Sequence, residues 1–204
     1  MRVIILHGRL RSYLAFFCLL SLSTLTHSHE INIDGKLDEP SWDLAEEYTK
    51  FYESFPFTLK TPSSFQKVLI LEDSNGIYFG FINQQEKEQV RANKHERDDE
   101  MSNADKVGVS IDFDGNGLVA YSFSVSAGGS ISDGIYRNEN EINYDWDADW
   151  KSEVYIDDDY WFAEIFIPWT IAPMKSIDGP SRPVKLNFCR LLASEWKVHS
   201  SIKC

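Results

Sequence analysis

The chain has 204 residues and a formal net charge of −12, and 14% of its residues are aromatic. Such an acidic surface argues against binding to nucleic acid or to anionic lipid, and the aromatic content argues against a disordered chain. Once an N-terminal segment is set aside, about 175 residues remain, which is enough for one domain with a sizeable hydrophobic core.

Residues 1–28 have the three parts of a secretory signal peptide. Three arginines precede an apolar run at residues 13–25, and small polar residues follow up to Ser28. An apolar run of about a dozen residues is too short to cross a bilayer, which requires ~20 helical residues. We therefore expect cleavage after Ser28, export to the periplasm, the outer membrane or the medium, and no membrane insertion of the mature chain. Cleavage removes three arginines and no acidic residue, so the net charge becomes −15.

The first expected element is a short helix in DEPSWDLAEE, residues 38–47. Asp38 can cap its N-terminus, Pro40 suits its first turn, and Trp42 and Ala45 would share one face. The charged stretch 84–100 is the second region with helix signals. Both are expected to connect strands.

From residue 65 onward the dominant pattern is a period-two alternation of apolar and polar residues. Turn-forming clusters such as DSNG (73–76) separate the segments, which is typical of successive antiparallel hairpins. The predicted strands are FQKVLILED (65–73), IYFGFIN (77–83), DKVGVSIDF (105–113), VAYSFSV (119–125), WKSEVYI (150–156), YWFAEIFI (160–167) and VKLNFCRLL (184–192). The sequence therefore predicts an all-β fold in residues 29–204. We expect one antiparallel, jelly-roll-like β-sandwich of about nine strands with short connecting helices.

The stretch IDFDGNG (111–117) has Asp112, Asp114 and Asn116 at the spacing that opens a calcium-binding loop. The twelfth position of such a loop needs a bidentate acid, and Phe123 stands there. Alternating apolar residues on both sides indicate that strands, not helices, flank the motif. We therefore predict a hairpin turn and no cofactor, while a weak calcium site completed by distant acids remains open.

Two acidic stretches, NYDWDADWKSE (143–153) and ERDDEMSNAD (96–105), contain the best candidates for ligand contacts. Aromatic rings can pack against the C–H faces of sugars while nearby acids accept hydrogen bonds from hydroxyl groups. Core packing is the competing interpretation for the two tryptophans, more so for the second. The candidate ligand-binding residues are Tyr144, Trp146, Asp147, Trp150 and Arg97.

Arg97 belongs to the second stretch, in which four acids at 98–100 and 105 accompany it. Paired carboxylates can serve as acid and base in glycoside hydrolysis, but only when they flank the scissile bond at a set separation. We instead expect a solvated acidic loop in which Arg97 bridges to a neighbouring aspartate. No catalytic residues and no metal ligands are predicted.

The order of these landmarks resembles the family 9 carbohydrate-binding modules, in the divergent form found at the N-terminus of larger bacterial cell-envelope proteins. The resemblance covers residues 31–192 and rests on INIDGKLDEPSW, IYFGF, RDDEMSNADKVGVSIDFDGNG, AYSFSVSAGGSISDGIY, WDADWKSEV and WFAEIFIPW. It implies a jelly-roll-like β-sandwich that binds sugar. Members of this family are non-catalytic and are often attached to glycoside hydrolases.

The chain departs from the sugar-binding members at four positions. A Trp, a Glu, an Arg and an Asn of those members correspond here to Ser102, Gly108, Ser124 and Ser126. None of these four can stack on a sugar ring or form a charge-assisted hydrogen bond with it. The resemblance therefore does not carry the familiar sugar site over to this chain.

The expected function is carbohydrate binding by an exported domain, as an accessory module linked to carbohydrate catabolism. Relatives of this form continue past the LNFCR strand into a large β-barrel, whereas this sequence ends at Cys204. The alternative is therefore a structural domain whose partner is a cell-envelope protein, as a truncated copy of a larger outer-membrane protein. A glycoside hydrolase is a third, less favoured interpretation. Two cysteines follow the signal, Cys189 and Cys204, and their pairing is left open.

Overall fold

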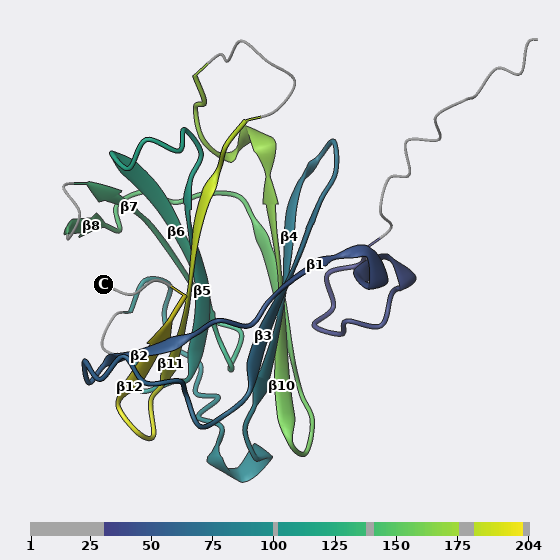
Figure 1. Ribbon diagram of the computed structural model, residues 1–204, viewed down its shortest axis with the longest axis vertical. Helices are drawn as coiled ribbons and strands as arrows, with labels where there is room; N and C mark the ends of the chain where they lie inside the picture. Colours follow the sequence, from purple (N-terminus) through teal and green to yellow (C-terminus); the bar gives the residue numbers. More distant parts are fainter. Residues whose placement is uncertain (1–30, 100–101, 138–140, 176–181, 202–204) are drawn as a thin grey trace, which may run out of the picture.

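The computed structural model describes residues 31–99, 102–137, 141–175 and 182–201. Two antiparallel sheets lie face to face as the two layers of a β-sandwich (Figure 1). The five-stranded sheet has the order β1-β3-β4-β10-β9, and the seven-stranded sheet has the order β2-β12-β11-β5-β6-β7-β8. The predicted all-β sandwich is confirmed, with twelve strands in the described ranges where about nine were expected.

Seven of the twelve strands match the predicted segments to within one residue at each end. They are β3 (Gln66–Glu72), β4 (Gly76–Gln84), β5 (Lys106–Asp112), β6 (Val119–Ser126), β9 (Lys151–Ile156), β10 (Tyr160–Pro168) and β11 (Lys185–Leu192). The other five were not predicted. They are β1 (Glu46–Tyr48), β2 (Tyr52–Phe55), β7 (Ile131–Arg137), β8 (Glu141–Asn143) and β12 (Lys197–Ser200).

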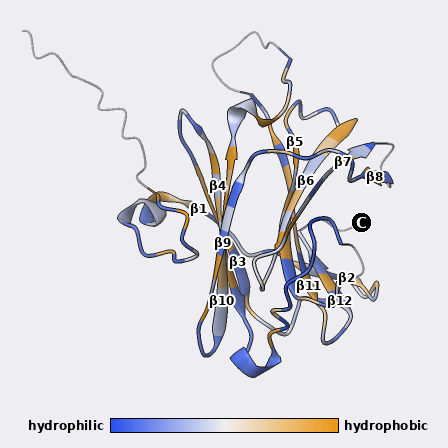
Figure 2. Ribbon diagram, turned by 180° about the vertical axis from the view of Figure 1, so that it is seen from behind, coloured by the Kyte–Doolittle hydropathy of each residue, from blue (hydrophilic) through white to orange (hydrophobic). Residues whose placement is uncertain are grey.

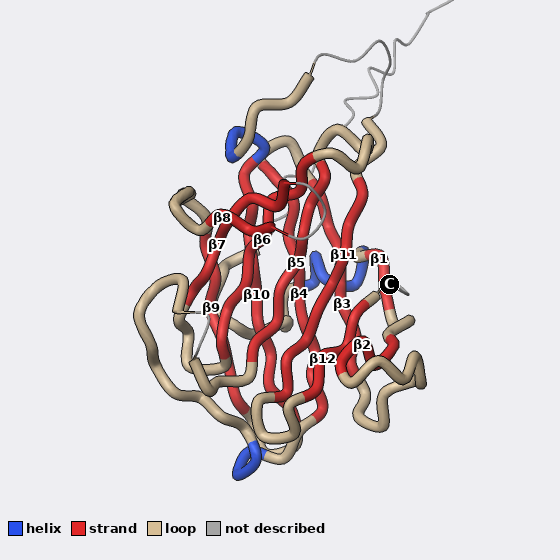
Figure 3. Tube along the Cα trace, turned by 90° about the vertical axis from the view of Figure 1, so that its left-hand side faces the viewer, coloured by secondary structure: helices blue, strands red, loops and turns tan. Residues whose placement is uncertain are grey.

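The expected helices are reduced to short 3-10 turns, drawn in blue in Figure 3. Two of these turns, η1 (Pro40–Leu44) and η2 (Lys87–Gln89), lie in the two expected stretches. A third, η3 (Trp169–Ile171), was not predicted. The expectation that Asp38 caps the first helix is wrong, because Glu39 occupies the N-cap position and no side chain forms a cap hydrogen bond there. Within the described ranges, no helix has the length and hydropathy needed to cross a membrane.

The main hydrophobic core fills the space between the two sheets. Alternate residues of β5, Val107, Val109 and Ile111, are buried there against Phe79 of β4 and Phe123 of β6. Each fully buried aliphatic or aromatic side chain of this size contributes roughly 1.5–3 kcal/mol. Figure 2 shows hydrophilic colours gathered in the loops at both ends of the sandwich.

A smaller second core lies on the outer face of the five-stranded sheet, where residues 31–45 pack (Figure 1). Trp42 is buried there, and Glu164 of β10 is fully buried beside it. The Glu164 carboxylate accepts hydrogen bonds from the backbone N–H groups of Asp34 and Gly35, both at 2.8 Å, and from Trp42 Nε1 at 3.1 Å. Gly35 has a φ of +86° and lies against the backbone of β9, so only glycine suits this position.

The predicted hairpin at IDFDGNG is confirmed, because β5 and β6 pair as antiparallel neighbours on either side of it. The Asp112 carboxylate accepts hydrogen bonds from the N–H groups of Asp114, at 3.1 Å, and Gly117, at 2.6 Å. Asp114 forms an ion pair with Arg182 at 2.9 Å. The acids of the motif therefore organise the turn and its neighbouring loop.

The predicted signal peptide, residues 1–28, lies outside the described residues, as does Cys204. Cleavage after Ser28 and the pairing of Cys189 with Cys204 accordingly stay predictions. Cys189 itself lies half-buried on β11.

Candidate functional site

The segment 144–150 joins β8 to β9, and these two strands are the edges of different sheets. Its side chains alternate: Tyr144, Trp146 and Ala148 are half-buried, Trp150 is buried, and the three intervening aspartates are exposed. An extended chain places successive side chains on opposite sides. The segment therefore closes one edge of the sandwich with its aromatic residues turned inward.

The two tryptophans of this segment differ in how much surface they present. Trp150 is 7% exposed, and its ring centroid lies 5.5 Å from that of Phe123, edge to face. Trp146 is half-buried and contacts the rings of Tyr121 and Phe123, at centroid distances of 5.1 Å and 5.9 Å. The expectation that Trp150 is the more buried of the two is confirmed. Its burial assigns Trp150 to core packing, because too little of the ring is exposed to stack on a ligand.

Arg97 connects three separate parts of the chain. Its Nε and Nη2 atoms donate to Asp133 Oδ1 on β7, and Nη2 also donates to the carbonyl oxygen of Ala148 at 3.1 Å. Its Nε atom lies 2.9 Å from Asp147 Oδ1 and 3.6 Å from Asp98 Oδ2. The predicted bridge to a neighbouring aspartate is confirmed, and two distant partners are added to it.

Asp133 is the buried centre of this arrangement, with 0% of its side chain exposed. Its second carboxylate oxygen accepts a hydrogen bond from the N–H of Ala148 at 2.8 Å, and its own N–H donates to Asp98 Oδ1 at 2.8 Å. Burial raises the pKa of Asp133, while the hydrogen bonds from Ala148 and Arg97 act in the opposite direction. We call Arg97, Asp98, Asp133 and Asp147 the arginine brace, since it fastens segment 144–150 to the seven-stranded sheet.

Carboxylate oxygens of Asp98, Asp133 and Asp147 all lie within 4.8 Å of one another, a spacing that could also suit a cation. The guanidinium group of Arg97 lies among them and supplies the positive charge.

The stretch 96–105 is not wholly solvated as expected, because Asp105 is fully buried. Asp105 accepts hydrogen bonds from the backbone N–H groups of Arg91 and Ala193. Asp105 therefore fastens two separate backbone segments to the start of β5.

A hollow of about 490 Å³ opens where segment 144–150 meets the end of β10 and η3. We call it the Trp146 hollow. Its lining combines aromatic surface with hydrogen-bonding groups, and includes Trp146, Asp147, Asp149, Lys151, Phe166 and Thr170. Trp150 also lines it, whereas Tyr144 and Arg97 do not. Of the five predicted ligand-binding residues, three thus border this hollow, and Arg97 acts on it through Asp147 and Ala148.

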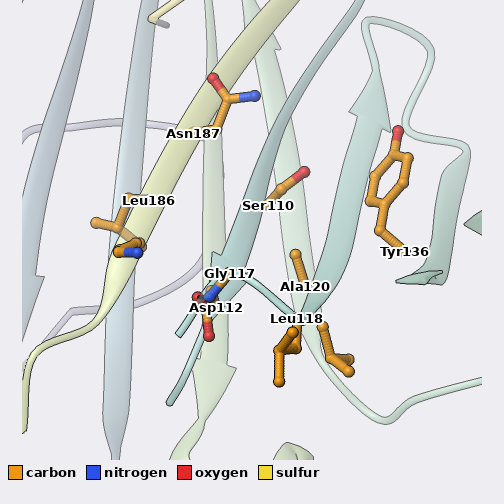
Figure 4. Close-up of a pocket in the computed structure, with 10 residues that line it drawn as sticks. Ser110, Asp112, Gly117, Leu118, Ala120, Tyr136, Leu186 and Asn187 are labelled. Atoms are coloured by element: carbon orange, nitrogen blue, oxygen red, sulfur yellow. Dashed lines mark hydrogen bonds between the residues drawn. The ribbon is translucent and has the colours of Figure 1, made fainter. Parts of the chain in front are cut away.

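A second hollow of about 490 Å³ lies over the outer face of the seven-stranded sheet (Figure 4). Asn187, Ser110 and Tyr136 line it from β11, β5 and β7, and Leu118 borders it from the hairpin tip. None of these four residues was predicted from the sequence as a site residue. The one feature of the sequence that could have indicated them is the period-two alternation, which places polar residues on the outer face of a sheet.

Next to this second hollow lie the positions at which sugar-binding relatives are expected to hold their ligand. Gly108 is paired with Ser124 on one side and Cys189 on the other. A Cβ atom at Gly108 would lie 2.8 Å from the carbonyl oxygen of Phe123 and 2.9 Å from the Cβ of Ser124. A glutamate therefore cannot occupy this position without moving the neighbouring strand.

Trp196, in the turn between β11 and β12, was not predicted from the sequence either. Its side chain is 71% exposed, in contrast to those of Trp42, Trp150 and Trp161, which are buried. Its φ of +50° is unusual for a bulky residue. Phe55 and Phe57, near the neighbouring edge strand β2, are exposed as well.

No protein-family model matches the sequence, and no curated protein matches it either. Solved structures do resemble it. A family 9 carbohydrate-binding module from Caldicellulosiruptor kristjanssonii, in complex with glucose, has a TM-score of 0.58 at 13% identity, with 83% of this chain and 79% of that chain covered. The same kind of module in complex with cellotriose gives a TM-score of 0.53 at 14% identity, with 83% and 77% covered.

A protein of Bacteroides uniformis to which carbohydrate binding has been ascribed gives a TM-score of 0.60 at 13% identity. The aligned part covers 79% of this chain and 80% of that chain. Likeness at this level of identity concerns the fold. The chain therefore has the β-sandwich fold of the family 9 carbohydrate-binding modules, in a divergent form.

Proposed function

We propose that this domain binds carbohydrate without catalysing a reaction, and that the Trp146 hollow is the binding site. The observation that carries the proposal is the meeting of a half-buried tryptophan with two exposed aspartates around a hollow of about 490 Å³. This volume lies within the range of ligand pockets, roughly 300–1,000 Å³. The ligand class is supported by the similar fold of modules solved with glucose and cellotriose.

The residues that line the hollow offer both apolar and polar contacts to a sugar. Trp146 and Phe166 offer carbon surface to the C–H face of a pyranose ring. Asp147 and Asp149 accept hydrogen bonds from hydroxyl groups, while Lys151 and Thr170 can donate them. The ion pair of 2.9 Å between Asp147 and Arg97 orients that carboxylate before a ligand arrives.

The non-catalytic part of the proposal is supported by how the nearby carboxylates are engaged. Glycoside hydrolysis uses two carboxyl groups that flank the scissile bond. Of the two carboxylates that line the hollow, Asp147 and Asp149, the first is already engaged in an ion pair with Arg97 at 2.9 Å. An accessory role beside carbohydrate-degrading enzymes fits a domain of this kind.

A glycan array and affinity gel electrophoresis test this proposal directly. The wild-type protein should be retained by at least one glycan, and Trp146→Ala should lose at least ten-fold in affinity while keeping its far-ultraviolet spectrum. Trp196→Ala is the matched control, because it removes an exposed tryptophan that does not line the hollow. Absence of retention on every glycan, or equal losses in both variants, would refute the assignment.

A second candidate function, an interaction domain of a cell-envelope assembly, is favoured by the exposed aromatic residues Phe55, Phe57 and Trp196. Large apolar side chains grouped at a sheet edge are typical of protein contacts. A pull-down from envelope extracts with wild type and with Phe57→Ser separates the two functions. This candidate predicts capture of one envelope protein by wild type, and loss of that protein in the variant.

Export is a further part of the proposal, supported by the arrangement of residues 1–28. Fractionation of cells that express the full sequence should place the processed chain, beginning at His29, outside the cytoplasm. Recovery of an unprocessed cytoplasmic chain would contradict it.

A further inference from the structure

The Trp146 hollow has more negative than positive charge. Its lining contains three charged side chains, the carboxylates of Asp147 and Asp149 and the ammonium group of Lys151. All three residues are exposed, so a ligand can reach them. Two acids against one base leave the lining with an excess of negative charge. A neutral sugar does not use this excess, and an acidic sugar is repelled by it.

Arg97 reduces this excess only in part, because its one positive charge is shared among three carboxylates. Its Nε atom lies 2.9 Å from Asp147 Oδ1 and 3.6 Å from Asp98 Oδ2. Its Nη2 atom pairs with Asp133. The side chain of Asp147 is 71% exposed, so its carboxylate stays open to a ligand while Arg97 orients it.

The carboxylate of Asp149 is not neutralised by a neighbour. It forms no ion pair within the ranges that the structure describes, and neither does Lys151, two positions further along the chain. Asp147 and Asp149 lie on the same side of an extended segment, and two steps along such a segment span about 7 Å. Both carboxylates can therefore contact one small cation that lies between them.

The ring of Trp146 favours the same charge in a ligand as the two carboxylates do. The face of a tryptophan ring attracts an ammonium group that lies within ~6 Å of the ring centroid. Trp146 borders the same hollow and is half-buried. Its ring centroid lies 5.1 Å from that of Tyr121 and 5.9 Å from that of Phe123, and these contacts hold the ring in place.

We propose that the Trp146 hollow is selective for an amino sugar, a hexose unit with a free ammonium group in place of one hydroxyl group. The ammonium group donates charge-assisted hydrogen bonds to Asp147 and Asp149, while the sugar ring packs against Trp146. N-acetylation of the amine removes its charge and with it this selectivity. The inference rests on the proposed function, because it names the class of sugar that the same site binds.

Calorimetric titration of the whole protein at pH 6 with three trisaccharides tests the proposal. The ligands are the β-1,4-linked trimers of glucosamine, N-acetylglucosamine and glucose, which differ only at carbon 2. The glucosamine trimer should bind at least ten-fold more tightly than the other two, and this advantage should decrease at high salt, which screens exposed charges. Equal binding of all three would overturn the selectivity and leave the proposed function standing. Binding of no trimer would overturn the selectivity as well, and the glycan array then decides the proposed function.

Matched variants assign the selectivity to the hollow. Asp149→Asn keeps the shape of the side chain, removes its charge, and should weaken binding of the glucosamine trimer at least five-fold. Asp158→Asn is the control, because Asp158 is exposed in the turn at the other end of β9 and does not line the hollow; it should leave binding unchanged. Lys151→Gln should act in the opposite direction and strengthen binding at least two-fold. Equal losses in the two aspartate variants, or weaker binding by Lys151→Gln, would contradict the proposal.

A cation without a sugar ring separates recognition of an amino sugar from attraction of any ammonium group. Tri-lysine has ammonium groups but no pyranose ring for Trp146 to contact, so it should bind at least ten-fold more weakly than the glucosamine trimer. Trp146→Ala should reduce the affinity for the glucosamine trimer at least ten-fold. If tri-lysine binds as tightly as the trimer, the acidic segment attracts cations in general and the proposal fails.

Discussion

Two buried titratable groups act on the stability of this fold in opposite directions over almost the same range of pH. Glu164 is fully buried, and burial raises its pKa from 4.5 to about 7, against the effect of the N–H groups of Asp34 and Gly35. His199 is buried as well, and burial, followed by the charge of Arg190, lowers its pKa from 6.5 to about 4. Each difference corresponds to about 3 kcal/mol of unfolding free energy.

The two signs follow from which state binds the proton. Folded Glu164 holds its proton more tightly than the unfolded chain does, so its contribution is present below pH 4.5 and is lost as the pH rises to about 7. Folded His199 resists protonation, so its contribution is present above pH 6.5 and is lost as the pH falls to about 4. Between pH 4.5 and 6.5 the two contributions offset each other in the wild-type protein.

The variant His199→Asn should unmask the contribution of Glu164. Urea unfolding, followed by tryptophan fluorescence from pH 4 to 8, gives the unfolding free energy of each protein. The difference between wild type and His199→Asn should increase by about 3 kcal/mol from pH 4 to 6.5, since exposed acids are the same in both proteins and cancel. The matched variant Glu164→Gln should give the reverse, a difference that decreases by about 3 kcal/mol from pH 4.5 to 7. A change below 1 kcal/mol for either pair would refute the assignment of these pKa values to burial.

Three further substitutions test particular contacts by the same unfolding measurement. Trp196→Gly should stabilise the protein by roughly 0.5–1 kcal/mol, because it relieves a left-handed backbone conformation that costs a bulky residue ~1–2 kcal/mol; a destabilised variant would show that the exposed ring makes contacts worth more than this strain. Gly108→Ala should destabilise by about 1–3 kcal/mol, because its Cβ would lie 2.8 Å from the Phe123 carbonyl oxygen; an unchanged stability would mean that the two strands separate easily. Arg97→Met should cost about 1–3 kcal/mol by leaving Asp133 buried and unpaired, with some relief from the solvent around Arg97, and adding Asp133→Asn should recover most of this loss.

The long inner strands could be predicted from sequence because their alternation is complete. β5 and β10 bury their apolar residues between the sheets and reach full length without interruption. The missed strands lack this pattern. β1 and β8 have three residues each and are mostly exposed, and β7 contains Asp133-Gly134, which are turn-forming residues. Pairing with a longer neighbour, not local preference, makes these segments strands.

The helix expected at residues 38–47 is replaced by a 3-10 turn for a related reason. Its Trp42 is fixed by the hydrogen bond from Nε1 to Glu164, 122 residues away, and by packing on the outer face of the five-stranded sheet. These tertiary contacts accommodate a single 3-10 turn, and β1 follows almost at once. Propensity is a weak prior when such contacts compete with it.

The candidate site shows the same division between local and distant information. Trp146 and Asp147 could be chosen from sequence because aromatic and acidic residues alternate within a few positions. Asp133 could not be chosen, because it is followed by Gly134 and looks like part of a turn. Its partner Arg97 is also 36 residues away in the sequence. Gln66 and Arg190 are further apart still, and each alone has an ordinary strand pattern. Their common burial near His199 is visible only after folding.

The close approach of β5 and β6 at Gly108 restricts which side chains this part of the sheet can present to a ligand. A bulky or charged residue is excluded there by the backbone of β6, and Ser124 beside it is small. Gly108 therefore cannot be replaced by a glutamate without a shift of the strands. Segment 144–150 is under no such constraint, because it lies across an open edge and is fastened by the arginine brace and not by sheet pairing. A binding surface can change at such an edge while the strands keep their register, which supports the proposed location of the ligand site at this segment.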